Sequence, residues 1–339
     1  MSATVAVVGA GGWGTAIARL LANQGHRVLL WVREPEIADA IERTRENVPF
    51  LSGVAIPAAV EVVRDLAAVT DGPRDAIVFA VPSSFLAATA GRLPEWAATG
   101  ATLVSVAKGL DHGTGRRPTQ ILMAVLGAPA DRVCALSGPS HAEEVGRDLP
   151  TAVVAASASP ETAARIQRLF IGPRFRVYAQ TDVAGVELGG ALKNIIAVAC
   201  GIADGLGLGD NTQAAMVTRG LAEVTRLGVA MGARRDTFMG LSGLGDMVVT
   251  CTSLHSRNRR VGRRLGKGER LEDVLGGMAQ VAEGVEACRS AWRLARERGI
   301  RMPITEQTHR VLFEGVPAAR ALDELMNRGA RSEEEPDGA

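Results

Sequence analysis

The sequence predicts an α/β fold in which a doubly wound parallel sheet is followed by an all-helical C-terminal domain. Short β-branched runs alternate with helical patterns up to about residue 180, an order typical of parallel strands covered by helices. From Thr181 onward the strand pattern stops and long helical patterns take over. At 339 residues the chain also exceeds the size at which one hydrophobic core stops growing, so we expect two domains.

The predicted strands are short and apolar along their whole length. A strand with one solvent-exposed face alternates apolar and polar residues, whereas a strand buried on both faces is apolar throughout. The observed pattern therefore favours a parallel sheet between two helical layers. We expect strands at residues 4–8, 27–32, 60–63, 76–81, 102–107, 133–136 and 151–156.

The second half of the chain has the periodicity of helices. We expect them at residues 182–204, 212–231, near Asp246, at 257–265 and at 285–298. The last residues, 329–339, are acidic and poor in apolar side chains, which is typical of a disordered end. The expected domains are therefore 1–185 and 186–328, followed by the tail 329–339.

Composition excludes several classes of partner. The 38 Lys and Arg residues nearly balance the 37 Asp and Glu residues, so no global field attracts nucleic acid or an anionic membrane. The longest apolar stretch, around 195–203, is shorter than the roughly 20 residues that span a bilayer, and the chain opens on a strand rather than on a leader peptide. We expect a cytoplasmic protein with no membrane span.

The four cysteines are widely scattered, so their spacing predicts neither a metal site nor a redox pair. We expect reduced thiols in or near the core, and no bound metal.

A glycine-rich turn, Gly9-Ala10-Gly11-Gly12-Trp13-Gly14, directly follows the first predicted strand and opens a helix. In that setting Gly9 permits the tight turn, Gly11 lets the backbone approach a pyrophosphate, and Gly14 lets the helix pack closely on the sheet. The first amides of the helix would face the phosphates. A bare strand-to-helix turn is the alternative, but the context favours a Rossmann-type dinucleotide site.

The end of the second predicted strand bears on the choice of cofactor. A carboxylate at this point binds the ribose hydroxyls of NADH, whereas an arginine suits the 2′-phosphate of NADPH. Because Arg33 comes first, we favour NADPH. The adjacent Glu34 leaves NADH open, and a solvated surface arginine is the alternative interpretation of Arg33.

Two lysines are candidates for acid/base chemistry. Lys108 follows the predicted strand 102–107, at a carboxyl end of the sheet, where open α/β folds bind ligands. Lys193 lies in a predicted helix that also holds Gly189 and Gly190, each costing about 1 kcal/mol there relative to alanine. Something must therefore approach that helix closely.

Reduction of a carbonyl by hydride needs a proton donor, and a lysine near another cation has the lowered pKa that this role requires. We take Lys193 as the donor, with Lys108 beside it. The alternative for either lysine is a charge that reaches solvent from an apolar helix.

A third cluster follows in the second half. Asp246 and Thr250 are four residues apart and share a helix face, so both can point at one lysine or one hydroxylated substrate. Ser256, Arg257 and Asn258 supply a charged fork and neutral donors suited to phosphate. A solvated basic helix face is the alternative interpretation of this last segment.

Taken together, these segments resemble the NAD(P)-dependent glycerol-3-phosphate dehydrogenases of bacterial type over nearly the whole chain. The resemblance is carried by GAGGWGTAIA from Gly9, VAKGL around Lys108, LSGPSHAEEV from Leu136, GGALKNIIAVACGIADGLGLGDNTQAA from Gly189, GLSGLGDMVVTCTSLHSRNRRVG from Gly240 and VAEGV from Val281. It implies reversible reduction of dihydroxyacetone phosphate to sn-glycerol 3-phosphate, the precursor of glycerophospholipids.

The resemblance also implies roles for individual residues. Lys193 matches the proton donor and acceptor, and we add Lys108 and Asp246 as its catalytic partners. The substrate-binding positions are Lys108, Gly138, Ser140, Lys193, Asn194, Asp246, Thr250, Ser256, Arg257 and Asn258. With the glycine motif included, the cofactor positions are Gly9, Gly11, Gly12, Trp13, Gly14, Arg33, Phe50, Lys108, Ala142, Arg257, Val281 and Glu283.

Two other functions are compatible with these patterns. A β-hydroxyacid dehydrogenase also pairs a dinucleotide domain with a helical domain that carries a lysine, and it would give Arg257 a carboxylate partner. A non-catalytic module that senses NADH is the other, and the two lysines and Asp246 weigh against it. The apolar helical second domain leads us to expect a homodimer.

Overall fold

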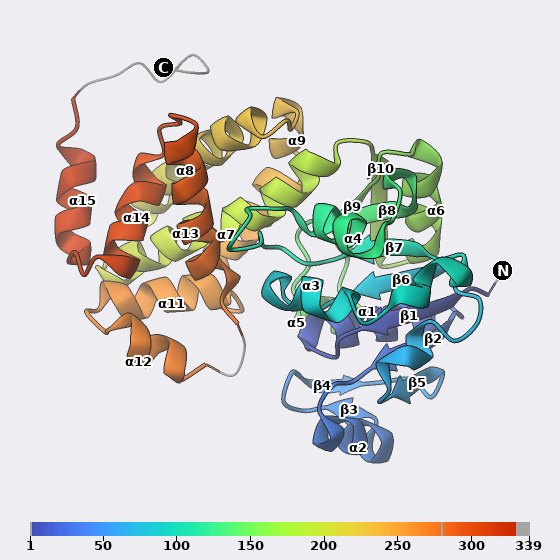
Figure 1. Ribbon diagram of the computed structural model, residues 1–339. Coiled ribbons are helices and arrows are strands. Elements are labelled where there is room, and N and C mark those ends of the chain that lie inside the picture. The colour runs from blue at the N-terminus through green and yellow to red at the C-terminus, as the bar shows by residue number, and fades with distance from the viewer. Residues whose placement is uncertain (1, 279–280, 330–339) are drawn as a thin grey trace. The chain divides into compact units, whose positions relative to one another are not determined.

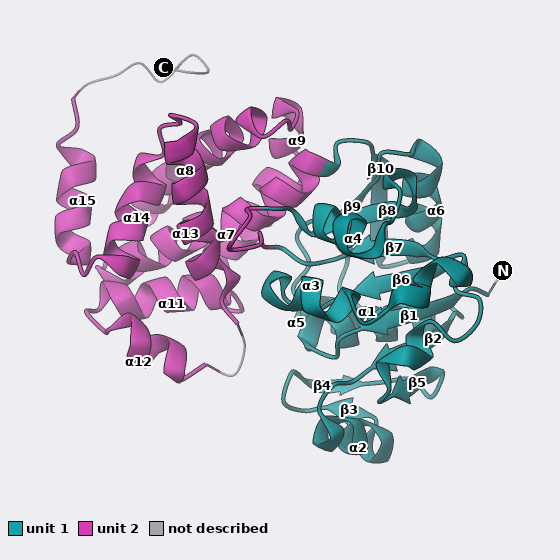
Figure 2. Cartoon of the chain, viewed as in Figure 1, with its two compact units in different colours: residues 1–108, 116–183 teal, residues 109–115, 184–339 magenta. Residues whose placement is uncertain are grey.

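The computed structural model describes residues 2–278 and 281–329, and the chain divides into two compact units (Figure 2). Unit 1 comprises residues 1–108 and 116–183, and unit 2 comprises 109–115 and 184–339. The loop 109–115 belongs to unit 2 because Leu110 packs into that unit's helical core. The domain limits expected from the sequence remain a prediction, and residues 330–339 of the expected tail lie outside the described residues.

Unit 1 contains an eight-stranded sheet with the order β10-β9-β8-β7-β6-β1-β2-β5 (Figure 1). From β5 to β8 this is the order of a doubly wound dinucleotide-binding sheet, as the sequence predicted. The strands are β1 (Thr4–Val8), β2 (Arg27–Trp31), β5 (Val60–Val63), β6 (Ala76–Phe79), β7 (Thr102–Ser105), β8 (Val133–Ser137), β9 (Thr151–Ala156) and β10 (Phe175–Gln180).

The sheet departs from the expected parallel arrangement at one pair, since β8 and β9 are antiparallel. The helix between them, α5 (Ala142–Gly146), has five residues and spans about 7.5 Å, whereas the five residues of β8 span about 16 Å. Such a short helix does not return the chain to the start of β8, so β9 enters from the edge at which β8 ends. β10, which the sequence did not indicate as a separate strand, continues the sheet parallel to β9.

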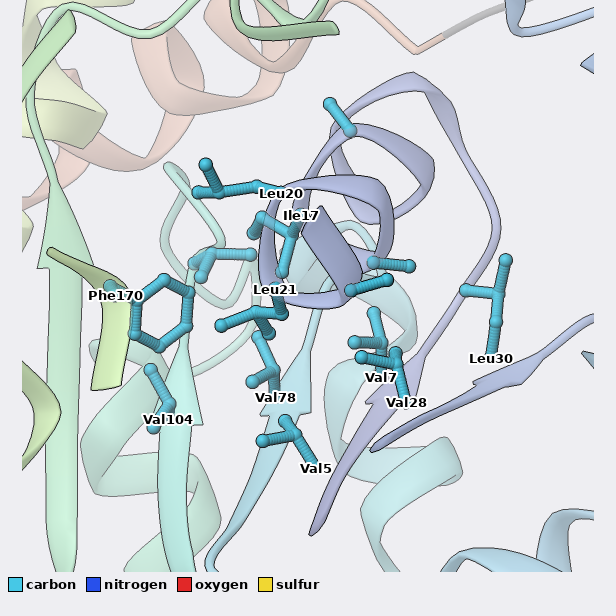
Figure 3. Packing of buried hydrophobic residues seen from close by; sticks show 14 of the residues in the cluster. Val5, Val7, Ile17, Leu20, Leu21, Val28, Leu30, Val78, Val104 and Phe170 are labelled. Atoms are coloured by element: carbon cyan, nitrogen blue, oxygen red, sulfur yellow. The ribbon is translucent and has the colours of Figure 1, made fainter. Parts of the chain in front are cut away.

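The strands of unit 1 contribute side chains to two hydrophobic cores, one on each face of the sheet. Alternate residues of β1 show the division, because Val5 and Val7 belong to one core and Val8 to the other. Figure 3 shows Leu21 of the first helix lying over Val78 in the first of these cores. The helices of this unit are α1 (Gly12–Asn23), α2 (Pro35–Thr44), α3 (Ser83–Ala90), α4 (Pro118–Leu126), α5 and α6 (Pro160–Phe170).

All the regular secondary structure in the described part of unit 2 is helical. Its helices are α7 (Val183–Gly205), α8 (Asp210–Ala230), α9 (Arg235–Phe238), α10 (Asp246–Thr252), α11 (Arg257–Gly266), α12 (Leu271–Gly276), α13 (Glu283–Glu297), α14 (Pro303–Phe313) and α15 (Ala318–Met326). Among the described helices, α7 alone has the length and apolar composition to cross a bilayer. It is longer than the stretch that the sequence singled out, but its side chains are buried in the core of unit 2.

Two pairs of glycines let α7 and α11 cross with their backbones in contact. A methyl group on Gly262 would overlap the carbonyl oxygen of Val198, and one on Gly201 would overlap that of Arg259. The same relation holds one turn further along for Gly205 and Gly266. The relative position of these two helices is therefore set by residues that have no side chain.

A buried carboxylate caps α14 and predicts a pH-dependent stability. Glu223 accepts hydrogen bonds from the backbone N–H groups of Ile304 (2.7 Å) and Thr305 (3.1 Å), yet burial raises its pKa to about 7 from the ordinary 4.5. Because the folded pKa is the higher one, the folded state holds the extra proton between pH 4.5 and 7. This contribution is complete below pH 4.5 and is lost as the pH rises to about 7.

We expect the free energy of unfolding of the wild type to fall, relative to that of Glu223→Gln, by about 3 kcal/mol between pH 4.5 and 8. Urea unfolding of both proteins across this range measures the difference. Parallel profiles would show that Glu223 titrates normally in the folded protein.

Candidate active site

The glycine-rich turn of unit 1 has the geometry that the sequence predicted. Gly9 has a φ of +109°, which side chains rarely allow, and a methyl group on Gly14 would overlap the Gly9 carbonyl oxygen. A Cβ on Gly11 would meet nothing within 4 Å, so this side of the turn is open. Gly11 caps α1 without a side-chain hydrogen bond, and the first amides of the helix suit a pyrophosphate. These residues fit a dinucleotide.

A small hairpin, β3 (Glu46–Asn47) and β4 (Leu51–Ala55), adjoins this turn and was not expected from the sequence. The Phe50 carbonyl oxygen lies 2.8 Å from where a Cβ on Gly12 would be, and the Cβ of Ala142 lies 3.5 Å from the same point. The structure thus brings together three predicted cofactor positions from separate segments. It also explains glycine at position 12, since a side chain there would strike the hairpin.

The side chain of Asn47 links the same hairpin to the turn. Its Nδ2 donates hydrogen bonds to the carbonyl oxygen of Ala10 and to Oγ1 of Thr15, both at 2.8 Å. Sequence reasoning missed this residue, because an asparagine 37 positions from the turn carries no local pattern that relates the two.

Arg33, the residue predicted to distinguish NADPH from NADH, lies at the surface of unit 1. The Arg33 guanidinium pairs with the Glu34 carboxylate, with Nε at 2.8 Å from Oε1, and 65% of the Arg33 side chain is exposed. A phosphate that binds Arg33 would therefore compete with its neighbour. Trp13, at the start of α1, is partly buried against the sheet core, and its indole Nε1 has no hydrogen-bond partner in the described chain.

Lys108 is held at the carboxyl ends of β7 and β8, as expected. Its Nζ donates hydrogen bonds to the carbonyl oxygen of Gly138 (2.8 Å) and to Oγ of Ser140 (3.1 Å). Three predicted substrate positions of unit 1 thus form one cluster. Gly138 has a φ of +142°, and a Cβ there would lie 2.9 Å from the Cα of Val153, so this position requires glycine.

The second lysine, Lys193, is at the centre of a buried polar cluster in unit 2. Its Nζ lies 2.8 Å from Oδ1 of Asp246 and donates a hydrogen bond to Oγ1 of Thr250. Lys193 is 4% exposed and Asp246 1%, so the ion pair is almost wholly withdrawn from solvent. Of the two partners that the sequence allowed for Asp246 and Thr250, a lysine or a hydroxylated substrate, the structure shows the lysine in contact with both.

Local structure explains how these side chains reach one another. Residues Leu241–Gly245 form a single π-helical turn just before Asp246, a feature often found at functional sites. A Cβ on Gly189 would lie 2.8 Å from the Ser242 carbonyl oxygen of that turn. The close approach to α7 that the glycines predicted is therefore made by the segment that carries Asp246.

The thiol next to Thr250 takes no part in this chemistry. A hydrogen bond with Cys200 and burial together raise the pKa of Cys251 well above its ordinary value, so the thiol stays neutral. All four cysteines are free and buried, as the sequence predicted.

The remaining predicted residues of unit 2 lie around the N-terminus of α11. Asn258 donates from Nδ2 to Oδ1 of Asn194 (2.9 Å) and accepts from the backbone N–H of Gly284 (3.0 Å), which ties α11 to α7 and α13. Ser256 caps α11 by accepting from the backbone N–H of Arg259.

Arg257 is exposed and donates from Nη1 to the carbonyl oxygen of Val281 (3.0 Å), while Glu283 begins α13. The buried side chains in this region therefore organise the helices, whereas the Arg257 guanidinium remains exposed.

Lysine is rare among the basic residues of this chain. Lys108, Lys193 and Lys267 are the only lysines among the 38 basic residues. A guanidinium does not give up its proton in a protein, whereas an ammonium does when its surroundings lower its pKa. Two of the three lysines, Lys193 and Lys108, are buried or half-buried, whereas Lys267 is exposed and every other basic residue is an arginine.

Comparison with known proteins agrees with this geometry. Residues 4–163 match the family model for the N-terminus of NAD-dependent glycerol-3-phosphate dehydrogenase, and residues 182–323 match the model for its C-terminus. The glycerol-3-phosphate dehydrogenase [NAD(P)+] of Pelotomaculum thermopropionicum is 52% identical over 99% of this chain and 96% of that protein. The one from Moorella thermoacetica is 52% identical over 97% of each.

A crystal structure of glycerol-3-phosphate dehydrogenase from Coxiella burnetii superposes with a TM-score of 0.91 at 37% identity, covering 96% of this chain and 99% of that one. Sequence and fold agree over both units. The chain belongs to the NAD-dependent glycerol-3-phosphate dehydrogenase family.

Proposed function

We propose that this protein catalyses the reversible, NAD(P)H-dependent reduction of dihydroxyacetone phosphate to sn-glycerol 3-phosphate. The observation that carries the proposal is the buried cluster of Lys193, Asp246 and Thr250, in a chain whose two halves both match this family. A β-hydroxyacid dehydrogenase and a sensing module, which the sequence alone left open, are not supported by the comparisons.

Lys193 acts as the acid in the proposed reaction. When bound, the reduced nicotinamide supplies a hydride. As the ketone carbon takes up that hydride, Nζ of Lys193 gives a proton to the forming alkoxide, and the product is a secondary alcohol. Asp246 keeps the ammonium in place and Thr250 fixes its direction. In the reverse direction, the neutral amine takes the proton back.

The other polar groups bind and orient the substrate. Lys108 in unit 1 donates to the substrate oxygens from the place where it now contacts Gly138 and Ser140. Arg257 binds the phosphate, so that interactions with a group that does not react position the carbon that does. Ser256 and Asn258 support Arg257 by fixing the start of α11.

One assay tests reaction, substrate and cofactor together. The protein is mixed with dihydroxyacetone phosphate and either NADH or NADPH, and the loss of absorbance of the reduced nicotinamide is followed. We expect oxidation that depends on the phosphorylated ketone and not on a carboxylated one. Oxidation only with β-ketoacids would support the rival dehydrogenase.

We further propose that NADPH is the favoured cofactor, because Arg33 precedes Glu34 at the end of β2. Arg33→Asp should raise the KM for NADPH by about tenfold or more, since a charge-assisted hydrogen bond contributes about 1.5–3 kcal/mol, and should change the KM for NADH much less. Initial rates with each cofactor measure both constants. Equal changes would contradict the role of Arg33.

Arg257→Ala should raise the KM for dihydroxyacetone phosphate by one to two orders of magnitude, about 1.5–3 kcal/mol, because a charged hydrogen-bond donor to the phosphate is lost. The KM for the cofactor should change less. Arg260→Ala, at an exposed position one turn further along α11, is the matched control. An unchanged KM for the ketone would place the anion site elsewhere.

The proposal extends to the metabolic role, the cellular location and the oligomeric state of the protein. The product is a precursor of glycerophospholipids, and we place the enzyme in their synthesis. We also propose a cytoplasmic location and a homodimer. Light scattering of the purified protein would test the dimer.

A further inference from the structure

We propose that Asn47 is a positioning residue of the dinucleotide site, which holds the glycine-rich turn so that its amides, and not a carbonyl group, face the pyrophosphate. This inference deepens the proposed function and rests on it for the identity of the ligand. Asn47 lies in the hairpin β3–β4 of unit 1, outside the segments quoted above for the resemblance.

The contacts of Asn47 are fully buried. The residue has no exposed surface, and its Nδ2 uses two protons, one on the carbonyl oxygen of Ala10 and one on Oγ1 of Thr15, both at 2.8 Å. Thr15, on the first turns of α1, is also fully buried, and its own Oγ1 lies 3.4 Å from the same carbonyl oxygen. Two side chains thus converge on one backbone carbonyl inside the turn.

That carbonyl decides the electrostatics of the turn. Ala10 stands between Gly9, with its positive φ, and Gly11, so both neighbouring peptide groups can rotate at little steric cost. If the Ala10 carbonyl turned outward, its partial negative charge would face the pyrophosphate and repel it. Donors that hold it inward leave the first amides of α1 as the groups that meet the anion.

The other atom of the same amide indicates why asparagine is used here. Oδ1 of Asn47 is buried and accepts no hydrogen bond from the described residues. An unsatisfied buried acceptor is destabilising, and an apolar side chain of similar size would avoid that penalty. The two donated hydrogen bonds must therefore have a use that offsets this cost.

Asn47 also anchors the hairpin that covers Gly12. Its carbonyl oxygen accepts from the backbone N–H of Phe50 (3.1 Å), and the Phe50 carbonyl is the group closest to a Cβ built on Gly12. Asn47 therefore connects the turn between β1 and α1 with the Phe50 segment that lies against Gly12. Loss of its side chain should loosen both.

The test compares ligands that share the pyrophosphate. For Asn47→Ala we expect the KM values for NADH and NADPH to rise by the same factor, about tenfold to a hundredfold, with kcat at saturation changed less than about threefold. The Kd of ADP-ribose, measured by calorimetry, should rise by a similar factor. Asn47→Asp, which places a carboxylate against the Ala10 carbonyl oxygen, should bind ADP-ribose no better than Asn47→Ala.

The control is Asn23→Ala at the exposed end of α1, which should leave the Kd of ADP-ribose unchanged. Thr15→Val removes the hydrogen bond from Thr15 to the Ala10 carbonyl and the one that Thr15 accepts from Asn47, but it keeps the bond from Asn47 to Ala10. It therefore tests the inference if Asn47→Ala does not fold. It should weaken ADP-ribose binding in the same direction and by less, whereas Thr15→Ser should bind like the wild type.

The outcomes separate this inference from the proposed function. If the wild type binds ADP-ribose and Asn47→Ala binds it equally well with only a lower melting temperature, Asn47 is merely structural and the inference is overturned. A normal Kd for Thr15→Val would overturn it as well. If the wild type itself fails to bind ADP-ribose, the proposed dinucleotide function is the part that fails.

Discussion

Lys193→Ala is expected to lower kcat by about two to four orders of magnitude, the usual scale for the loss of a positioned acid/base group. The ammonium it removes is paired with Asp246 in a nearly dry cluster, so bulk water cannot easily replace it as the proton donor. The Kd of the cofactor should stay near the wild-type value, because the glycine-rich turn belongs to unit 1. Stopped-flow kinetics and titration of nicotinamide fluorescence measure the two quantities.

Removal of Lys193 also leaves Asp246 buried without its partner, at a cost of about 3–5 kcal/mol, so a lost rate has to be separated from lost stability. Lys193→Arg makes that separation. The guanidinium keeps a positive charge next to Asp246 but does not release its proton, so kcat should fall nearly as far as in Lys193→Ala while the protein stays more stable.

The matched control is Lys267→Ala, the only other lysine of unit 2, which is exposed at the end of α11. Its kcat should equal that of the wild type. A Lys193→Arg variant with a near-normal kcat would mean that another group donates the proton.

Gly262→Ala should lower the free energy of unfolding by about 3 kcal/mol, the upper part of the range for overpacking. The added methyl group would overlap the Val198 carbonyl oxygen and would lie 2.8 Å from the Ile202 backbone nitrogen. No flexible side chain is available to move away, so α7 and α11 have to separate. Because α7 carries Lys193 and α11 carries Arg257, the KM for dihydroxyacetone phosphate should rise as well.

Gly276→Ala is the control for this change, because a Cβ at that position meets nothing within 4 Å and lies at the exposed end of α12. Its stability should change by less than about 0.5 kcal/mol. Urea unfolding of both variants gives the comparison. If Gly262→Ala proves as stable as Gly276→Ala, the two helices have more freedom to move apart than their contact indicates.

Local patterns in the sequence were enough to predict the main helices and strands of both units. β1 and β9 have the predicted bounds, and the glycine motif lies between β1 and α1 as expected. α7 begins and ends within one residue of its prediction. These elements are set by apolar runs and by glycines next to each other in the chain, so their patterns can be recognised without knowledge of distant neighbours.

Other features had no such pattern. β10 alternates buried and exposed residues at the edge of the sheet and so lacks the continuous apolar run by which the other strands were recognised, and the two-residue strand β3 is too short to show any periodicity. The link from Asn258 to Asn194 joins residues 64 positions apart, and nothing near either asparagine indicates the other. The scarcity of lysine, by contrast, was present in the sequence and would have strengthened the choice of Lys193 and Lys108.

The sequence by itself determined the fold class, the glycine-rich turn and the chemical types of the candidate site residues, because each depends on residues that are close in the chain. Only the tertiary structure decided that β9 runs against β8, that Asp246 and Thr250 converge on Lys193, and that Asn47 holds the Ala10 carbonyl. The physical reason is the same in each case. A hydrogen bond or an ion pair depends on distances in space, and folding sets those distances between residues that the sequence keeps far apart.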